Sequence, residues 1–120
     1  MSCKAAVRHA GNVTIVDLSG RITLGDGSGL VRNTIKDQLN AGHKDLLLNL
    51  ADVTYMDSAG LGELVGAYAS VTNAGGRIKL LNAQGRVSEV LAVTKLYTVF
   101  ESFSDEAAAL ASFPAGAAGA

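Results

Sequence analysis

Alternating apolar and polar segments predict a series of strands and helices along this chain. Residues 46–50 form a short and almost continuous apolar run, which is typical of a buried strand. Beyond this run we predict a helix of about residues 58–73, because apolar residues recur at helical spacing on one face; they are Leu61, Leu64, Val65, Tyr68 and Val71. A strand-to-helix loop joins the two segments and places Asp57 and Ser58 where an N-cap belongs. Ligands and partners usually bind at this edge of an open α/β sheet, so we expect the loop to be the functional end.

The beginning of the chain predicts a β-hairpin. Strands are expected at residues 4–9 and 13–18, and Ala10-Gly11-Asn12 joins them, because glycine and asparagine can adopt the positive φ of a tight turn. Apolar residues occupy both parities of the second strand, so both of its faces should be covered, and Gly20 should end it.

A helix of about residues 28–41 is predicted to follow the hairpin. Apolar residues recur at every fourth position there and would form its buried stripe. Asp26 or Ser28 can cap its start, and Gly42 fits the left-handed position after its end.

The second half of the chain continues the alternation. Gly75-Gly76 should end the helix of residues 58–73, and residues 77–82 should form a strand. A strand, helix and strand of this length are typical of a βαβ unit with parallel strands and a right-handed crossover. The other expected elements are a helix of about residues 86–93, a strand near residues 98–103 and a helix of about residues 104–112 capped by Ser104.

Length and charge narrow the class of protein. A chain of 120 residues supports one core, so residues 1–113 should form a single domain, and the Ala/Gly-rich residues 114–120 should be a disordered tail. The net charge is −1 and the basic residues are scattered, which predicts no binding to nucleic acid or to an anionic membrane. No apolar run reaches the ~20 residues of a membrane-spanning helix and no signal peptide opens the chain, so we expect a cytoplasmic protein.

Ser58 is the leading candidate for a functional side chain. The simpler alternative is that Ser58 or Asp57 only caps the helix. However, two glycines in its first turn, Gly60 and Gly62, should each cost about 1 kcal/mol of helix propensity relative to alanine. A second stripe of this helix consists of small residues, namely Gly62, Gly66, Ala69 and Asn73. A helix without bulk on this side lets another surface come close, either a partner or the protein's own first helix.

The same position suits a phosphorylation switch. A phosphate on Ser58 would lie at the positive end of the helix dipole, so the fold should tolerate it. Its charge of about −1.5 to −2 would instead act on a partner docked there, where Asp57 and Glu63 are already acidic.

Nucleotide binding is a weaker alternative. The spacing Gly60-x-Gly62-x-x-x-Gly66 is one residue off the dinucleotide-binding fingerprint. Residues 25–29 are glycine-rich but lack the Gly-Lys-Ser/Thr ending of a phosphate loop.

Catalysis and metal binding are not predicted. Ser58 does not lie in the Gly-x-Ser-x-Gly turn of an esterase nucleophile, and Asp17 is expected to face outward from its strand. We expect His9 and His43 to be surface residues, and Cys3 is the single cysteine, so a disulfide and a metal site are excluded from the prediction. We therefore predict no enzymatic activity, no metal and no cofactor.

The residues Asp57-Ser58-Ala59-Gly60-Leu61-Gly62, placed after the buried strand, resemble the signature of STAS domains. More narrowly, they resemble the bacterial anti-sigma factor antagonists (anti-anti-sigma factors). The likeness runs through residues 4–112 and includes residues 18–22 and 76–82. Ala59 stands where members of the family often carry serine or threonine.

The resemblance implies an α/β fold, with a mostly parallel sheet of four or five strands, an N-terminal hairpin and about four helices packed chiefly on one face. It implies partner switching: the unmodified protein binds an anti-sigma factor that is also a serine kinase, and so releases the sigma factor. The kinase then phosphorylates Ser58, which ends the binding, and a serine phosphatase resets the cycle. The expected partner-binding residues are Asp57, Ser58, Ala59, Gly60, Leu61, Gly62, Glu63, Gly66 and Asp26.

A second function stays open at this point. STAS domains also act as scaffold or adaptor subunits of larger signalling or lipid-transport assemblies, in which the serine matching Ser58 need not be phosphorylated. A homodimer and weak nucleotide binding are also left open.

Overall fold

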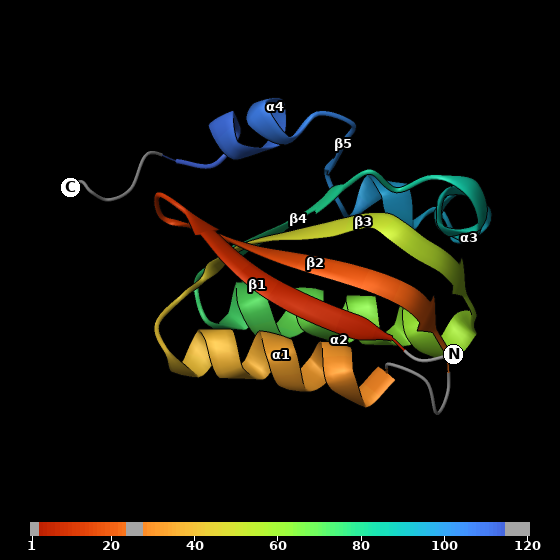
Figure 1. Cartoon of the computed structure of the whole chain (residues 1–120), viewed down its shortest axis with the longest axis horizontal. Coiled ribbons are helices and arrows are strands. Elements are labelled where there is room, and N and C mark those ends of the chain that lie inside the picture. Colours follow the sequence, from red (N-terminus) through yellow and green to blue (C-terminus); the bar gives the residue numbers. More distant parts are fainter. Residues whose placement is uncertain (1–2, 24–27, 115–120) are drawn as a thin grey trace.

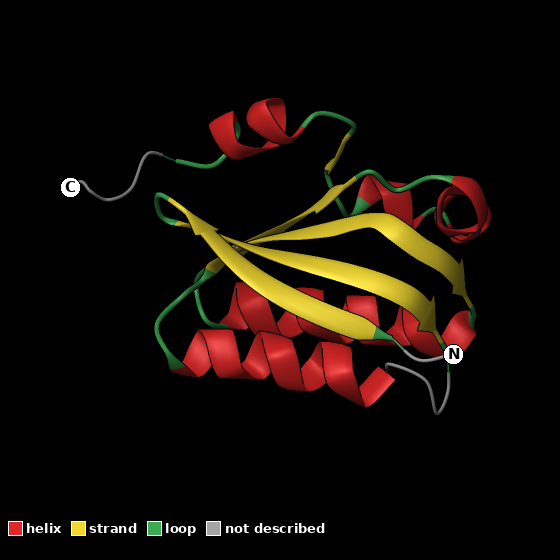
Figure 2. Ribbon diagram, viewed as in Figure 1, coloured by secondary structure: helices red, strands yellow, loops and turns green. Residues whose placement is uncertain are grey.

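A five-stranded sheet is built from the apolar segments of the chain, and helices cover its two faces (Figure 1, Figure 2). The computed structural model describes residues 3–23 and 28–114, so Asp26 and residues 115–120 of the predicted tail lie outside the described residues. The strands are β1 (Lys4–Ala10), β2 (Val13–Ile22), β3 (Asp45–Met56), β4 (Arg77–Leu81) and β5 (Ser102–Phe103). The helices are α1 (Ser28–Asn40), α2 (Ser58–Asn73), α3 (Gly85–Thr94) and α4 (Glu106–Ala111), with a 3-10 turn at Leu96–Thr98.

The strands lie in the order β1-β2-β3-β4-β5. β1 and β2 pair antiparallel through a turn in which Gly11 has a φ of 61°, whereas all the later neighbours pair parallel. This arrangement confirms the predicted mostly parallel sheet with an N-terminal hairpin. The parallel pairing of β3 and β4 also confirms the βαβ unit around α2.

β2 and β3 are longer than predicted. Gly20 does not end β2: it has a φ of 94° and lies between two register shifts, and the strand continues to Ile22. Residues 51–56, expected as part of a loop, are the second half of β3 and pair with this extension. The physical reason is burial, because Val53 and Met56 pack into the core and hold the segment against β2.

Three helices cover the same face of the sheet. Alternate residues of the three central strands, from Val16 in β2 to Leu80 in β4, meet apolar side chains of α1, α2 and α3 in one cluster. Figure 1 shows α1 and α2 lying side by side along this face. The helices are thus packed chiefly on one face, as expected.

The short helix α4 covers part of the opposite face. Ala109 and Phe113 pack there on the other parity of the strands, which includes Ile15 and Leu47. Both faces of β2 are therefore covered, as its apolar pattern predicts. Asp105 caps α4 by accepting a 2.8 Å hydrogen bond from the N–H of Ala108, so the predicted cap at Ser104 is wrong by one residue.

A buried lysine anchors the end of α4 to the sheet. Lys79 of β4 is 7% exposed, and its Nζ donates to the carbonyl oxygen and to the hydroxyl of Ser112, each at 3.0 Å. Nζ also lies 2.9 Å from a carboxylate oxygen of Glu101 and over the ring of Phe113. Since a buried ammonium is costly without such partners, these contacts fix the position of the helix end.

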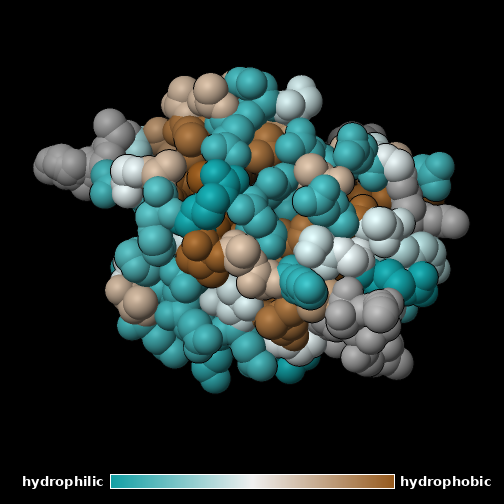
Figure 3. Space-filling view, viewed as in Figure 1, coloured by the Kyte–Doolittle hydropathy of each residue, from teal (hydrophilic) through white to brown (hydrophobic). Residues whose placement is uncertain are grey.

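Ion pairs attach the edge strand to its neighbours. The guanidinium of Arg8 in β1 lies 2.6 Å from a carboxylate oxygen of Asp17 in β2 and 2.9 Å from one of Glu106 in α4. Asp17 also accepts a 2.8 Å hydrogen bond from Asn49. On the side of the molecule seen in Figure 3, hydrophilic residues predominate and hydrophobic residues form separate small groups.

The ion pair predicts a pH-dependent loss of stability. The hydrogen bond from Arg8 lowers the pKa of Asp17 in the folded chain. The stabilisation that the ion pair of Asp17 adds to the folded chain is therefore complete above the pKa of an unfolded aspartate, about 3.9. This stabilisation is lost as the pH falls through the lower pKa of Asp17 in the folded chain.

We expect Arg8→Met to move the pKa of Asp17 upward in an NMR titration. We also expect the loss of stability that Arg8→Met causes, measured by urea denaturation, to be larger at pH 7 than at pH 2.5. Arg32→Met, which removes another surface ion pair, is the control and should leave the pKa of Asp17 unchanged. An Asp17 pKa equal in Arg8→Met and wild type would contradict the assignment.

Candidate functional site

The start of α2 is fixed by Asp57. Its backbone is extended, with φ −107° and ψ −173°, and its carboxylate accepts a 2.9 Å hydrogen bond from the N–H of Gly60. The carbonyl of Asp57 accepts the first intrahelical bond, from Leu61, also at 2.9 Å. Of the two predicted caps, Asp57 is therefore the N-cap and Ser58 is the first helical residue. Ser58 therefore does not cap the helix.

Gly60 allows the first turn of α2 to lie directly against the end of β2. A Cβ at this position would overlap the carbonyl oxygen of Ile22 and lie 2.9 Å from its Cγ2. The N–H of Asp57 donates to the same carbonyl at 3.4 Å. The surface that approaches Gly60 is therefore the end of β2, and not the first helix that the sequence suggested as a neighbour within the chain.

Ser58 begins an exposed face of α2 that carries no charge. The exposed residues of the helix are Ser58, Gly62, Val65, Gly66, Ala69, Ser70, Thr72 and Asn73. Val65 was predicted to face the core, but it is 42% exposed. Ala67 is buried in the core with Leu61, Leu64 and Val71, and Tyr68 is partly buried against them. We name these eight exposed residues the α2 outer face. A surface without charges can be covered by a partner at little electrostatic cost of desolvation.

Glu63, the one charged residue of α2, points toward α1. Its carboxylate accepts a 2.8 Å hydrogen bond from the guanidinium of Arg32 in α1, and this carboxylate raises the pKa of Arg32. Beside this pair a groove of about 410 Å³ runs between the two helices. Gly62 and Gly66 line it, and a Cβ at either position would meet no atom within 4 Å. The small-residue stripe therefore leaves an open groove.

A second hollow adjoins Ser58 on the side of α3. It has a volume of about 400 Å³, and Ser58 and Leu61 line it together with Val90 and Val93 of α3. Val93 is 83% exposed, the most exposed large apolar side chain of the described residues. Sequence reasoning missed the part that α3 plays here. The available signal was that Val93 lies outside the buried stripe formed by Val87 and Leu91.

The structure separates the predicted site residues into two groups. Ser58, Gly62 and Gly66 are exposed, and Asp57, Ala59 and Glu63 are partly exposed around them. Gly60 and Leu61 are buried beneath the helix start, although Leu61 reaches the floor of the hollow. Asp26 lies outside the described residues, so its place relative to this group is not assigned.

The other candidate residues lie elsewhere. His9 and His43 are at the opposite end of the sheet, near the start of β3, and Asp17 is engaged by Arg8. Across residues 3–23 and 28–114, no three or more His, Cys, Asp or Glu side chains form a group that could hold a metal. No helix in the described part of the chain is both long enough and apolar enough to span a membrane.

Comparison with known proteins places this chain in one family. The model of the STAS domain family matches residues 4–109. The anti-sigma-B factor antagonist of Bacillus subtilis is 40% identical over 57 residues, which are 48% of this chain and 52% of that protein. The anti-sigma F factor antagonist of Paenibacillus polymyxa is 26% identical over 111 residues, covering 92% of this chain and 94% of that protein.

The fold is also that of a solved structure. The crystal structure of an anti-sigma factor antagonist from Mycobacterium paratuberculosis superposes with a TM-score of 0.81 at 20% identity, covering 92% of each chain. At this identity the likeness concerns the fold. The chain spans about half of the length of the Bacillus subtilis relative.

The cap assignment predicts different costs for two adjacent substitutions. Asp57→Ala removes the acceptor of the Gly60 N–H and should lower the free energy of unfolding by about 0.5–2 kcal/mol. Ser58→Ala removes an exposed hydroxyl and should change it by no more than about 0.5 kcal/mol. Urea denaturation monitored by circular dichroism measures both. A loss beyond about 2 kcal/mol for Ser58→Ala would show that Ser58 is the structural cap.

The two glycines of the first turns should respond in opposite directions. Gly60→Ala forces the helix away from Ile22 and should cost about 1–3 kcal/mol of stability. Gly62→Ala is the matched control, since its methyl group enters open space and should raise stability by up to about 1 kcal/mol through helix propensity. Equal effects of the two substitutions in urea denaturation would contradict the close approach at Gly60.

Proposed function

We propose that this chain, which belongs to the STAS domain family, is an anti-sigma factor antagonist that phosphorylation of Ser58 switches off. The observation that carries the proposal is the exposed Ser58 in the first turn of α2, at the edge of the uncharged α2 outer face. The names of the two curated relatives support the role, and one of them aligns over nearly the whole chain.

The partner of the unmodified protein is an anti-sigma factor that is also a serine kinase. It docks on the α2 outer face, where Gly62 and Gly66 present the helix backbone without side chains. Exposed Val93 of α3 borders the same end of the helix across the hollow beside Ser58, so an apolar group of the partner can be buried there. Occupying this surface removes the anti-sigma factor from its sigma factor.

The modification transfers the γ-phosphoryl group of ATP to the Oγ of Ser58. The Ser58 O–P bond forms, the bond to the β-phosphate oxygen breaks, ADP leaves, and the hydroxyl proton passes to a base of the kinase. A serine phosphatase reverses the state by hydrolysis. Because Ser58 is not the cap, the reaction disturbs no hydrogen bond on which the start of α2 depends.

The phosphate acts on the partner and not on the fold. At the amino end of α2 it lies near backbone N–H groups and the positive end of the helix dipole, which stabilise an anion. Its charge of about −1.5 to −2 nevertheless has to be desolvated when a partner covers the uncharged α2 outer face. The carboxylates of Asp57 and Glu63 add to the repulsion of any acidic group on that partner.

The switch predicts that Ser58→Asp abolishes binding to the cognate anti-sigma kinase while the fold stays intact. Calorimetry should show a loss of at least about 100-fold in affinity, since one unpaired charge in an interface costs several kcal/mol. Ser102→Asp adds the same charge at an exposed position of β5 and should bind like wild type. A Kd for Ser58→Asp within twofold of wild type would contradict the switch.

The modification itself is measured by intact mass. Protein isolated from its own cells should carry one phosphoryl group that a serine phosphatase removes and that Ser58→Ala lacks. A single unmodified mass during growth, starvation and stress would favour the scaffold function instead.

A further inference from the structure

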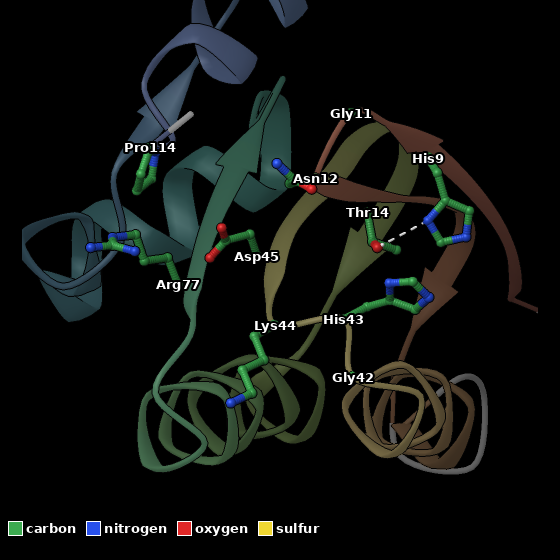
Figure 4. Close-up of a pocket in the computed structure, with 10 residues that line it drawn as sticks. All are labelled: His9, Gly11, Asn12, Thr14, Gly42, His43, Lys44, Asp45, Arg77 and Pro114. Atoms are coloured by element: carbon green, nitrogen blue, oxygen red, sulfur yellow. Dashed lines mark hydrogen bonds between the residues drawn. The ribbon is translucent and has the colours of Figure 1, made fainter. Parts of the chain in front are cut away.

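Two imidazoles lie against each other at the end of the sheet opposite Ser58 (Figure 4). His9 comes from β1, and His43 comes from the connection between α1 and β3. Their ring centroids are 4.7 Å apart and their planes are tilted by 41°. They are the two histidines of the chain, and they face each other beside a cavity of about 490 Å³.

The ring of His9 is held in place by a buried hydroxyl. Nδ1 of His9 lies 3.1 Å from Oγ1 of Thr14, its partner in the β1–β2 register, and Thr14 is 1% exposed. With Nδ1 engaged in this contact, Nε2 is the ring nitrogen available to a ligand. A histidine that binds a metal ion through one nitrogen usually donates a hydrogen bond from the other, which fixes the ring orientation.

The separation of the two rings matches shared coordination of one ion. Zinc binds imidazole nitrogens at about 2.0–2.1 Å in tetrahedral geometry, which places two nitrogens about 3.3 Å apart and two ring centroids about 5 Å apart. The observed 4.7 Å is close to that value, so the two rings are near enough to share one ion.

The charges around the pair permit a cation. Lys44 and Arg77 line the same cavity, but Figure 4 shows both side chains extending away from the imidazoles. Asp45, the acidic residue of the cavity lining, lies between Arg77 and the histidines in that view. No ammonium or guanidinium group therefore stands between the two rings in this cavity.

We propose that His9 and His43 together bind one divalent transition-metal ion of the zinc class, with water completing its coordination. Imidazole nitrogen favours zinc, nickel and copper over magnesium and calcium, which prefer oxygen ligands. Sequence analysis predicted no metal site because the chain has only two histidines and one cysteine, and it did not show that the fold brings the two histidines together. The ion connects the β1–β2 hairpin to the start of β3, and the proposal is independent of the switch at Ser58.

Calorimetric titration with zinc chloride tests the proposal. Cys3→Ser protein is used, so that the thiol cannot contribute. We expect one ion per chain with a micromolar Kd, and a loss of at least tenfold in affinity in both His9→Ala and His43→Ala. Magnesium chloride should produce no binding heat. No binding up to millimolar zinc would overturn the proposal. So would a single-histidine variant that keeps the wild-type Kd, because the two rings would then bind ions separately.

Thr14 provides a test of the positioning contact. Thr14→Val removes the hydroxyl that orients His9 and should weaken zinc binding about tenfold while one ion still binds per chain. Thr14→Ser keeps a hydroxyl and should retain the wild-type affinity, which controls for any change in packing at this buried position. Equal affinities of the Val and Ser variants would show that the hydroxyl does not position the ring.

Discussion

The placement of α2 depends on one contact between backbones, in which the first turn of the helix rests on the carbonyl of Ile22. Gly60 leaves room for this carbonyl, and Asp57 donates its N–H to the same oxygen while its carboxylate closes the turn. The extension of β2 past Gly20 brings that carbonyl to the required place. This contact determines which side of α2 faces the core. The exposure of Ser58 and of the α2 outer face follows from it.

The spacing of apolar and polar residues predicted which helices and strands form better than it predicted the residues at which they begin and end. The bounds of α2 follow from its apolar spacing and from the glycines after it, and the structure confirms them. The second half of β3 was missed because Asp52 and Thr54 interrupt the apolar pattern of that segment. They are exposed, whereas Val53 and Met56 are buried in the same cluster. The register shift that skips Thr54 brings these two residues to the same face, because in a regular strand they would point to opposite faces. The register shifts between β2 and β3 were missed because Gly20, which lies between them with a positive φ, was predicted to end β2.

Contacts between distant parts of the chain could not be predicted from spacing. Arg8 meets Glu106 and Lys79 meets Ser112 only because α4 crosses the second face of the sheet. The pairing of Arg32 with Glu63 likewise requires α1 and α2 to lie side by side. At the candidate site, the exposed serine and the small residues were predictable. The hollow beside α3 was not, because the position of α3 depends on how its apolar stripe meets β3.

The lack of a side chain at Gly60 affects how genetic data on this chain should be interpreted. Position 60 faces inward, yet a methyl group there would displace the whole start of α2. A screen for variants that lose the proposed partner recognition would therefore recover changes at a residue that forms no part of the exposed surface. Compensating changes at Ile22 would be rare, since the obstructing atom is a main-chain oxygen that no substitution removes. Selection on this position would act through helix placement, independently of the identity of the partner.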